Sequence, residues 1–185
     1  MIQILSQFDI TVTQFINNIL PHNLFFDYFF SFFSLRGNSI LIWFIIIVLI
    51  VAFEELKDHR FIVYFIIAFA LTSLLTNVII KNIFQRPRPY IRFNYETANQ
   101  YCPKDYSFPS SHAATSFAAA ATLSAFHKKR KYWFYAVAGL ISISRIYLYC
   151  HFLVDIACGA MLGYLIIKII LKLIYHKKFF NNIIL

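Results

Sequence analysis

Apolar side chains fill long, nearly uninterrupted stretches of this chain, and short polar connections separate them. Five stretches are close to the ~20 residues with which a helix crosses a bilayer, and they cover residues 37–53, 61–80, 111–126, 132–150 and 152–175. A segment in lipid must satisfy its backbone hydrogen bonds internally, so each stretch is expected to be a helix. The pattern predicts an all-α integral-membrane helical bundle with about five to six spanning helices.

The N-terminal part of the chain has a different periodicity. Between residues 2 and 20, apolar positions recur at helical spacing, and polar residues such as Asp9 and Asn17 occupy the other side. This arrangement predicts an N-terminal amphipathic helix that lies in the membrane interface or packs on the bundle. Residues 24–35 are rich in Phe but too few to cross a bilayer alone. We expect one domain, residues 1–185, with interfacial or peripheral helices at 1–35 and the bundle at 36–178.

The composition excludes a water-soluble globule. Hydrophobic residues make up 60% of the chain and charged residues 14%, against roughly half and a quarter in soluble domains. The net charge of +9 leaves too little soluble surface for a basic nucleic-acid groove, so no nucleic-acid partner is expected.

The basic residues orient the predicted bundle. If the five stretches are threaded in order, the short connections on one side hold Lys57, Arg60, Lys128, Lys129, Arg130, Lys131, Lys177 and Lys178. By the positive-inside rule this side is cytoplasmic. The long connection over residues 81–110 therefore faces outward.

A second group of cations contradicts the expected bias, because the outward side should be poor in Lys and Arg. This side holds Lys81, Arg86, Arg88, Arg92, Lys104 and Arg145. They come from separate backbone elements that can aim positive charge at one point, and phosphate is the natural anion for such a cluster. The alternative is that the side chains only reach toward water or contact lipid headgroups.

Two local patterns add candidate chemistry. The sequence Pro109-Ser110-Ser111-His112 precedes an alanine-rich helix, and a capped helix N-terminus is an anion site. It could also be no more than a helix cap.

His151 and Asp155 are four residues apart at the start of a helix. The carboxylate can therefore hold the imidazole in one tautomer and leave its other nitrogen free to attack. An acid inside an apolar stretch is costly and indicates function, although a helix-stabilising pair is the simpler alternative.

The cysteines indicate no metal or disulfide framework. Cys102, Cys150 and Cys158 are odd in number and have no CxxC spacing. We therefore predict neither a disulfide framework nor a zinc site.

The ordered patterns together resemble the three-part motif of the type 2 phosphatidic acid phosphatase family, which includes membrane lipid phosphatases and soluble vanadium haloperoxidases. The matching segments are Lys81-x6-Arg88-Pro89, Pro109-Ser110-Ser111-His112 and Ser144-Arg145-x5-His151-x3-Asp155. Ser111 stands where the family often has Gly, which bears on how closely the backbone approaches phosphate.

The resemblance implies roles for these residues. His151 would attack phosphorus to form a phosphohistidine, Asp155 would orient it, and His112 would protonate the leaving oxygen and then help to activate water. The residues that would hold the phosphate oxygens are Lys81, Arg88, Ser110, Ser111 and Arg145. No metal or other cofactor is expected, because fixed cations would take the metal's part.

The leading hypothesis is therefore an integral-membrane lipid phosphatase that hydrolyses a terminal phosphate of a lipid phosphate or diphosphate, with residues 36–178 as its catalytic bundle. Undecaprenyl diphosphate is the favoured substrate, ahead of phosphatidate, phosphatidylglycerol phosphate and lipid A phosphates. The alternative is a non-enzymatic transporter or anionic-lipid-binding protein, whose charges would line a pathway. We expect a bacterial inner membrane protein with the lipid bilayer around it and its site on the outer, extracytoplasmic face.

Overall fold

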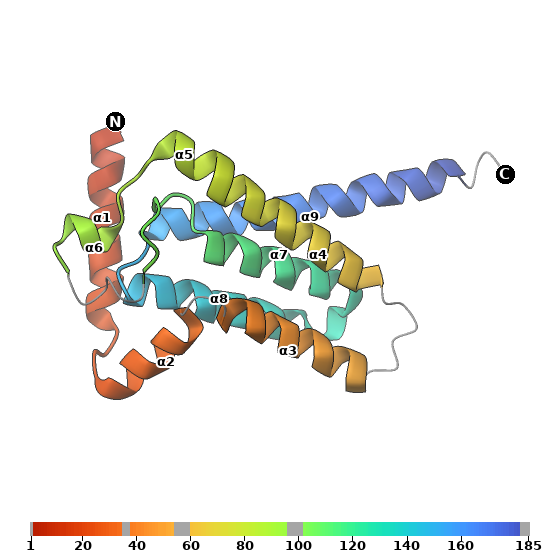
Figure 1. Ribbon diagram of the computed structural model, residues 1–185, viewed down its shortest axis with the longest axis horizontal. Coiled ribbons are helices and arrows are strands. Elements are labelled where there is room, and N and C mark those ends of the chain that lie inside the picture. Colours follow the sequence, from red (N-terminus) through yellow and green to blue (C-terminus); the bar gives the residue numbers. More distant parts are fainter. Residues whose placement is uncertain (1, 35–37, 54–59, 96–101, 182–185) are drawn as a thin grey trace.

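The computed structural model of the protein describes residues 2–34, 38–53, 60–95 and 102–181, with side chains between residues 6 and 173. All regular structure in these ranges is helical (Figure 1), which confirms the predicted all-α class. The helices are α1 (Ile2–Ile19), α2 (Leu24–Ser34), α3 (Asn38–Phe53), α4 (Arg60–Leu74), η1 (Leu75–Ile80), α5 (Lys81–Phe84), α6 (Pro89–Arg92), α7 (Ser111–Phe126), η3 (Lys128–Arg130), α8 (Lys131–Tyr147) and α9 (Leu153–Asn181). Lys57 and the side chains of Lys177 and Lys178, on which the predicted orientation partly depends, lie outside the described residues.

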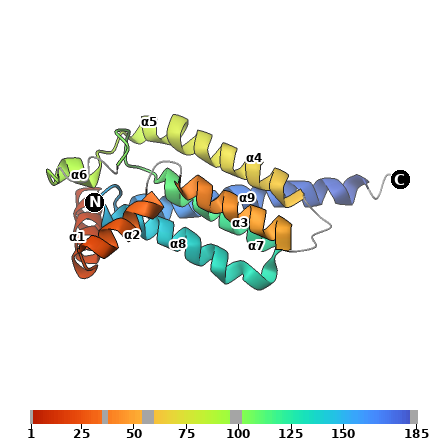
Figure 2. The same cartoon turned by 60° about the horizontal axis from the view of Figure 1, so that its bottom comes forward.

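The longer helices α3, α4, α7, α8 and α9 run along one axis, whereas α1 lies across one end of the bundle (Figures 1 and 2). That end also holds α5, α6, the start of α7, the end of α8 and the start of α9. The predicted outward motifs therefore meet at a single end of the molecule.

The central helix is α7, which packs against α4, α8 and α9. Several of its alanines, including Ala114 and Ala118, are fully buried, and such small residues let helices approach closely. The facing positions on α9 are Gly159 and Gly163, where a Cβ atom would lie 2.5 Å from the Ser110 carbonyl oxygen and 1.9 Å from that of Ala114 respectively. These glycines hold the start of α9 directly beside the start of α7.

The outer surface of the bundle is apolar. Phe44 on α3, Ile66 on α4 and Leu165 on α9 are exposed, as expected for side chains that face lipid. Two helical segments, Arg60–Arg92 and Leu153–Leu173, are long and apolar enough to cross a membrane, and α2 with α3 makes a third if that bent pair is one span. The protein is therefore an integral membrane protein with an apolar exterior.

The predicted count of about five to six spanning helices is not confirmed. The helices α7 and α8 have 16 and 17 residues, and at ~1.5 Å per residue each is shorter than the ~30 Å hydrocarbon layer. They are held largely by the other helices, which is why they can be short.

A helix forms at the N-terminus, α1, and its buried side carries polar residues. Phe8 and Phe15 are 66% and 63% exposed, whereas Asp9, Thr13 and Asn17 are buried. We call these three buried residues the α1 polar stripe. An amphipathic helix normally buries its apolar face, but in lipid the polar groups are the ones that need protein partners. The polar side of α1 therefore faces the bundle.

Asn17 shows how the stripe is used. Its side-chain nitrogen donates hydrogen bonds to the carbonyl oxygens of Ile146 at 3.0 Å and Tyr147 at 2.8 Å. These carbonyls lie in the last turn of α8, where the Ile146 carbonyl also accepts the backbone N–H of Tyr149 at 2.9 Å. The N-terminal helix thus caps the end of a helix far along the chain.

Candidate active site

The imidazole of His151 lies between a cation and an acid, just before α9 begins. Its Nε2 atom is 3.0 Å from Arg88 Nη1, and because a guanidinium only donates, Nε2 must be the unprotonated nitrogen. The proton is then on Nδ1, which lies 3.6 Å from Asp155 Oδ2. This tautomer leaves a lone pair on Nε2 pointing toward Arg88, where an anionic electrophile would be held.

The surroundings keep this histidine neutral. His151 is almost completely buried. Burial lowers its pKa well below the usual range, and the positive charges of Arg88 and Arg145 lower it further. A neutral imidazole is the form that can act as a nucleophile.

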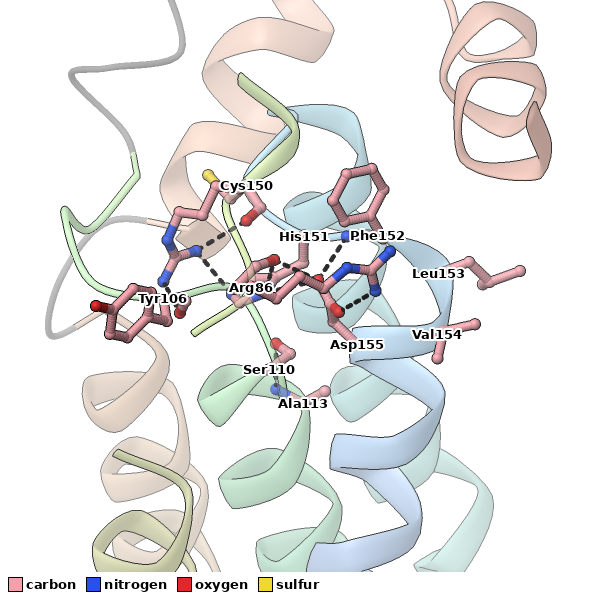
Figure 3. A network of polar contacts seen from close by, with 12 residues as sticks. Arg86, Tyr106, Ser110, Ala113, Cys150, His151, Phe152, Leu153, Val154 and Asp155 are labelled. Atoms are coloured by element: carbon pink, nitrogen blue, oxygen red, sulfur yellow. Dashed lines mark hydrogen bonds and ion pairs between the residues drawn. The ribbon is translucent and has the colours of Figure 1, made fainter. Parts of the chain in front are cut away.

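Asp155 is fully buried and has more partners than the sequence indicated. Its Oδ2 atom accepts hydrogen bonds from the Ser107 hydroxyl and, at 2.9 Å, from the backbone N–H of Phe152. Its Oδ1 atom accepts one from Arg86 Nη1 at 2.6 Å. Figure 3 shows Arg86 and His151 converging on this carboxylate. The position of Asp155 is therefore fixed by neighbours from separate segments.

The first predicted motif supplies two cations that share one acid. Arg88 is fully buried and donates to Asp105 Oδ1 at 2.6 Å, and Lys81 forms an ion pair with Oδ2 of the same residue. Burial alone would raise the pKa of Asp105, but its hydrogen bond to Lys81 and the charge of Arg88 outweigh this and lower the pKa to about 2. The protein thus neutralises this pair of cations with an acid from a loop, which a bound anion could replace.

Arg88 is held rigidly by main-chain oxygens as well. Its Nε donates to the Asp105 carbonyl at 2.7 Å and its Nη1 to the Cys150 carbonyl at 2.8 Å, and its Nη2 donates a longer bond of 3.2 Å to the Tyr106 carbonyl. A guanidinium held in this way is pre-positioned, so little reorganisation is needed when a ligand arrives.

Arg145 is a buried cation whose side chain has hydrogen-bond donors available for a ligand. It is completely buried, and its Nη1 donates to the Ser34 carbonyl at 2.9 Å, but its Nε and Nη2 have no hydrogen-bond partner in the part of the chain that the structure describes. Its own carbonyl accepts the backbone N–H of His151 at 3.2 Å, so it is tied to the nucleophile's backbone. Buried donors without partners are costly, and an anion would satisfy both.

The start of α7 brings in the second predicted motif. Ser110 is the N-cap, and its hydroxyl accepts the backbone N–H of Ala113 at 3.3 Å. The amides of Ser111 and His112 lie in the first turn, where a helix offers no acceptors for them. Together with the helix dipole, this makes the start of α7 suitable for a phosphate oxygen.

The His112 ring reaches both the cations and the outside of the bundle. The charges of Arg145, Arg88 and Lys81 act on it electrostatically, as does His151. The ring also lines a cavity of about 160 Å³ between α3, α4 and α7, together with Ser111 and Thr115. His112 thus lies at the start of α7, within the electrostatic influence of these cations and at the edge of this cavity.

A π-helical turn shapes this region. The turn η1 ends at Lys81, whose N–H bonds to the Thr76 carbonyl. One extra residue per turn rotates the helical segment after it, and such turns are frequent at functional sites. Within η1, Asn77 accepts a hydrogen bond from the Ser111 hydroxyl. The Ser111 side chain therefore points toward η1, and its backbone is the part left for phosphate.

One prediction about the cysteines is wrong. Cys102 and Cys150 form a disulfide, with their Cα atoms 5.3 Å apart, and Cys158 is free. The bond joins the 102–110 loop, which carries Asp105 and Ser107, to the residue before His151. The spacing in the sequence could not reveal it, because the fold alone brings residues 48 positions apart together.

The structure thus brings together Lys81, Arg88, Ser110, Ser111, His112, Arg145, His151 and Asp155, as the motifs predicted. It adds Arg86, Ser107, Asp105 and Asp9, to which the sequence patterns assigned no role beside His151 and Asp155. Asp9 lies on the polar side of the amphipathic N-terminal pattern, which does not identify its partner.

A buried histidine between fixed cations, inside a helical membrane bundle, defines a hydrolase of phosphoester bonds of the lipid phosphatase class. The chain belongs to the PAP2 superfamily, whose family model matches residues 61–179. The resemblance to the type 2 phosphatidic acid phosphatases is therefore confirmed.

Known proteins agree with this assignment. The structure of LpxE from Aquifex aeolicus is similar with a TM-score of 0.69 and 30% sequence identity, over 88% of this chain and 93% of that one. A PAP2-type phosphatidylglycerolphosphate phosphatase from Bacillus subtilis shares the fold, with a TM-score of 0.61 and 20% identity over 93% and 87% of the chains. The bacitracin transport permease protein BcrC of Bacillus licheniformis is 28% identical over 109 residues, which cover 59% of this chain and only 53% of that relative.

Proposed function

We propose that this protein removes the terminal phosphate from a lipid phosphate or diphosphate through a phosphohistidine intermediate on His151. The observation that carries the proposal is the placement of His151 Nε2, 3.0 Å from the Arg88 guanidinium and within the electrostatic influence of Arg145, whose Nε and Nη2 have no hydrogen-bond partner among the described residues. A phosphate that displaces the contact between Arg88 and Nε2 can place its oxygens on the cations and its phosphorus in front of the Nε2 lone pair.

In the first step, Nε2 of His151 attacks phosphorus, and the bond from phosphorus to the leaving oxygen breaks. His112 gives its proton to that oxygen, so the lipid alcohol or lipid monophosphate leaves. Asp155 stabilises the positive charge that develops on the His151 ring through Nδ1. The phosphoryl group then remains on Nε2.

In the second step, His112, now neutral, takes a proton from water as the water oxygen attacks phosphorus. The phosphorus–nitrogen bond breaks, phosphate leaves and His151 returns to its starting form. In both steps Lys81, Arg88 and Arg145 stabilise the charge on the phosphate oxygens, with the backbone amides at the start of α7. On substrate binding, phosphate oxygens take the place of the Asp105 carboxylate on Lys81 and Arg88.

The proposed substrate carries a long apolar tail, with undecaprenyl diphosphate favoured. The lipid-facing exterior lets a tail remain in the bilayer, and this remote binding holds the phosphate at the site during the encounter. A diphosphate leaves as a lipid monophosphate, a better leaving group than an alkoxide, and therefore asks less of His112. The exposed Arg92 is a proposed contact for the additional charge.

Release of phosphate by the purified protein in detergent tests the proposal. We expect kcat/KM to be highest for undecaprenyl diphosphate, intermediate for phosphatidate and lowest for a water-soluble phosphomonoester. Equal values for lipid and soluble substrates would refute the role of the tail, and a lead for phosphatidate would refute the diphosphate preference. No release from any lipid phosphate would refute the proposed function itself.

We also propose that the site faces the extracytoplasmic side of a bacterial inner membrane. The basic connections at the opposite end support this orientation, and a disulfide at the site end fits an oxidising compartment. The test uses a chain whose native cysteines are serines, with a new cysteine at position 104 or 130. An impermeant thiol reagent should label position 104 in intact cells and position 130 only after lysis, and the reverse pattern would refute the orientation.

A further inference from the structure

The α1 polar stripe reaches the backbone on both sides of His151. Beyond the contact of Asn17 with the end of α8, Thr13 Oγ1 accepts the N–H of Leu153 at 3.0 Å, and Asp9 Oδ1 accepts the N–H of Val154 at 3.0 Å. These amides belong to the first turn of α9 and have no acceptor within their own helix. The N-terminal helix therefore caps α9, the helix that carries Asp155.

Asp9 does more than cap. Its second oxygen, Oδ2, accepts a hydrogen bond from Arg86 Nη2 at 2.7 Å, while Nη1 of the same guanidinium donates to Asp155 Oδ1 at 2.6 Å. The guanidinium also lies 4.0 Å above the Phe152 ring, which fixes its plane. Arg86 thus joins two buried acids, and Figure 3 shows it against Asp155 at the start of α9.

This arrangement determines which oxygen of Asp155 serves His151. Arg86 occupies Oδ1, and Oδ2 is left to face Nδ1 of the imidazole at 3.6 Å. The charge of Arg86 is shared between Asp9 and Asp155, so Asp155 keeps enough negative charge to support a developing imidazolium. In a buried site with little solvent screening, such sharing has a large effect.

We propose that Asp9 is a positioning residue for the His151–Asp155 pair, acting through Arg86 by balancing its charge and holding its guanidinium in place. The inference rests on the proposed function, because it concerns the pair assigned there to the chemical step.

The groups that face the pair come from every neighbouring element. They are Arg86, Arg88 and Asp105 in the connections, Lys81 in α5, His112 in α7 and Arg145 in α8. Cations predominate in this set, so the negative charge of Asp9 matters. Its removal leaves Arg86 to act on Asp155 alone, which lowers the pKa of His151 and makes Nε2 a weaker nucleophile.

The test is Asp9→Asn in the full-length protein in detergent. The amide oxygen can still accept the Val154 N–H, but the charge is gone. With the substrate that the wild type hydrolyses best, we expect kcat to fall about tenfold with KM within about twofold. The acid limb of kcat/KM should move to lower pH by about half a unit, because the weakened negative field disfavours protonated His151.

Two other variants separate positioning from simple helix capping. Thr13→Val removes a cap bond from the same stripe without changing charge, so it should lower the melting temperature but leave the acid limb in place. Asp9→Glu keeps the charge and should keep the wild-type limb even where it lowers stability.

The outcomes distinguish the possible failures. A wild-type kcat and a wild-type acid limb of kcat/KM in folded Asp9→Asn would overturn the inference, and so would an equal shift of the acid limb in Thr13→Val. In either case His151→Ala still tests the proposed function. If Asp9→Asn does not fold, Asp9→Glu decides, and a shifted limb in that variant would overturn the inference. Inactivity of the wild type on every lipid phosphate would instead count against the proposed function.

Discussion

The backbone N–H of Ser110 donates a hydrogen bond of 2.9 Å to the carbonyl oxygen of Asp155. The bond joins the residue before α7 to the first turn of α9, so the His112 and His151 sides of the site share a main-chain link. Because the link uses only backbone atoms, side-chain replacements in the site leave it intact. Variants of the proposed catalytic residues should therefore report on chemistry more than on folding.

We expect His151→Ala and His112→Ala each to lower kcat by on the order of 10³-fold or more, since one removes the nucleophile and the other the general acid. Asp155→Asn should cost roughly 10²- to 10⁴-fold, because an amide cannot balance an imidazolium. The measurement is phosphate release, with size-exclusion and thermal unfolding as checks of folding. His22→Ala is the matched control. The His22 ring stacks on the Tyr147 ring, with 4.5 Å between their centroids, and does not belong to the proposed phosphate site. This variant should therefore change stability but not kcat. Normal turnover in His151→Ala would refute the assigned nucleophile.

The pH dependence should reflect the depressed pKa of His151, which burial and neighbouring cations lower well below 6.5. The neutral imidazole then persists to lower pH than in water, so the acid limb of kcat/KM that reports His151 should lie below pH 6.5. A pH series with the favoured lipid tests this. An acid limb centred at or above pH 6.5 that persists in the His112 variants would contradict the depressed pKa of His151.

Activity should survive chelation but not vanadate. The fixed cations Lys81, Arg88 and Arg145 supply the positive charge that a metal ion would otherwise provide. Vanadate adopts a trigonal-bipyramidal form that resembles phosphorus under attack, so it should compete with substrate. The measurement is turnover with EDTA and, separately, with vanadate. Complete loss in EDTA that magnesium restores would show a metal mechanism.

At Gly159 and Gly163 of α9, the contact with α7 leaves no room for a Cβ atom. A Cβ atom on Gly163 would meet the Ala114 carbonyl oxygen at 1.9 Å, so Gly163→Ala should destabilise the protein by about 1–3 kcal/mol and also lower activity by moving Asp155. Gly139 of α8 has nothing within 4 Å of the same position, and Gly139→Ala should stabilise by about 0.5–1 kcal/mol. Thermal unfolding in detergent compares the two variants. Equal changes in stability for the two variants would refute the close packing of α9 against α7 at Gly163.

The Cys102–Cys150 bond should be needed for a stable site. Cys102→Ser or reduction should lower the free energy of unfolding by about 2–4 kcal/mol and lower kcat, since the tether beside His151 is lost. Cys158→Ser is the control and should change neither. Thiol titration of the unfolded, unreduced protein should find the single free thiol of Cys158. Reaction at all the cysteines before reduction would show that the bond is absent.

Sequence patterns predicted the parts of this molecule that depend on local chemistry. Apolar stretches predicted the helices because lipid restricts the backbone, and the motif spacings predicted that Arg88, His151 and Asp155 would meet. The partners of Asp155 were not predictable in this way. Arg86 and Ser107 lie 69 and 48 residues from it along the chain, and only tertiary packing brings them together.

The burial of polar residues on α1 was not predictable for a similar reason. Periodicity shows that a helix has two faces, but it does not show which solvent each face meets. In water the apolar face would be buried, whereas here Phe8 lies outside and Asp9 inside. Apolar stretches alone do not determine the number of spanning helices either, because residues in α7 are apolar for packing against other helices.

The capping of α8 and α9 by α1 also has a consequence for biosynthesis. Asn17 leaves the ribosome 129 residues before Ile146, whose carbonyl it will bind. At roughly 5–20 residues per second, translation separates these partners by on the order of ten seconds. During that interval the side-chain nitrogen of Asn17 lacks the carbonyls of α8 that it will bind, although Arg86, the partner of Asp9, is synthesised earlier. The corner that holds His151 is therefore assembled last, and a chain whose synthesis stops before α9 is complete has no finished site.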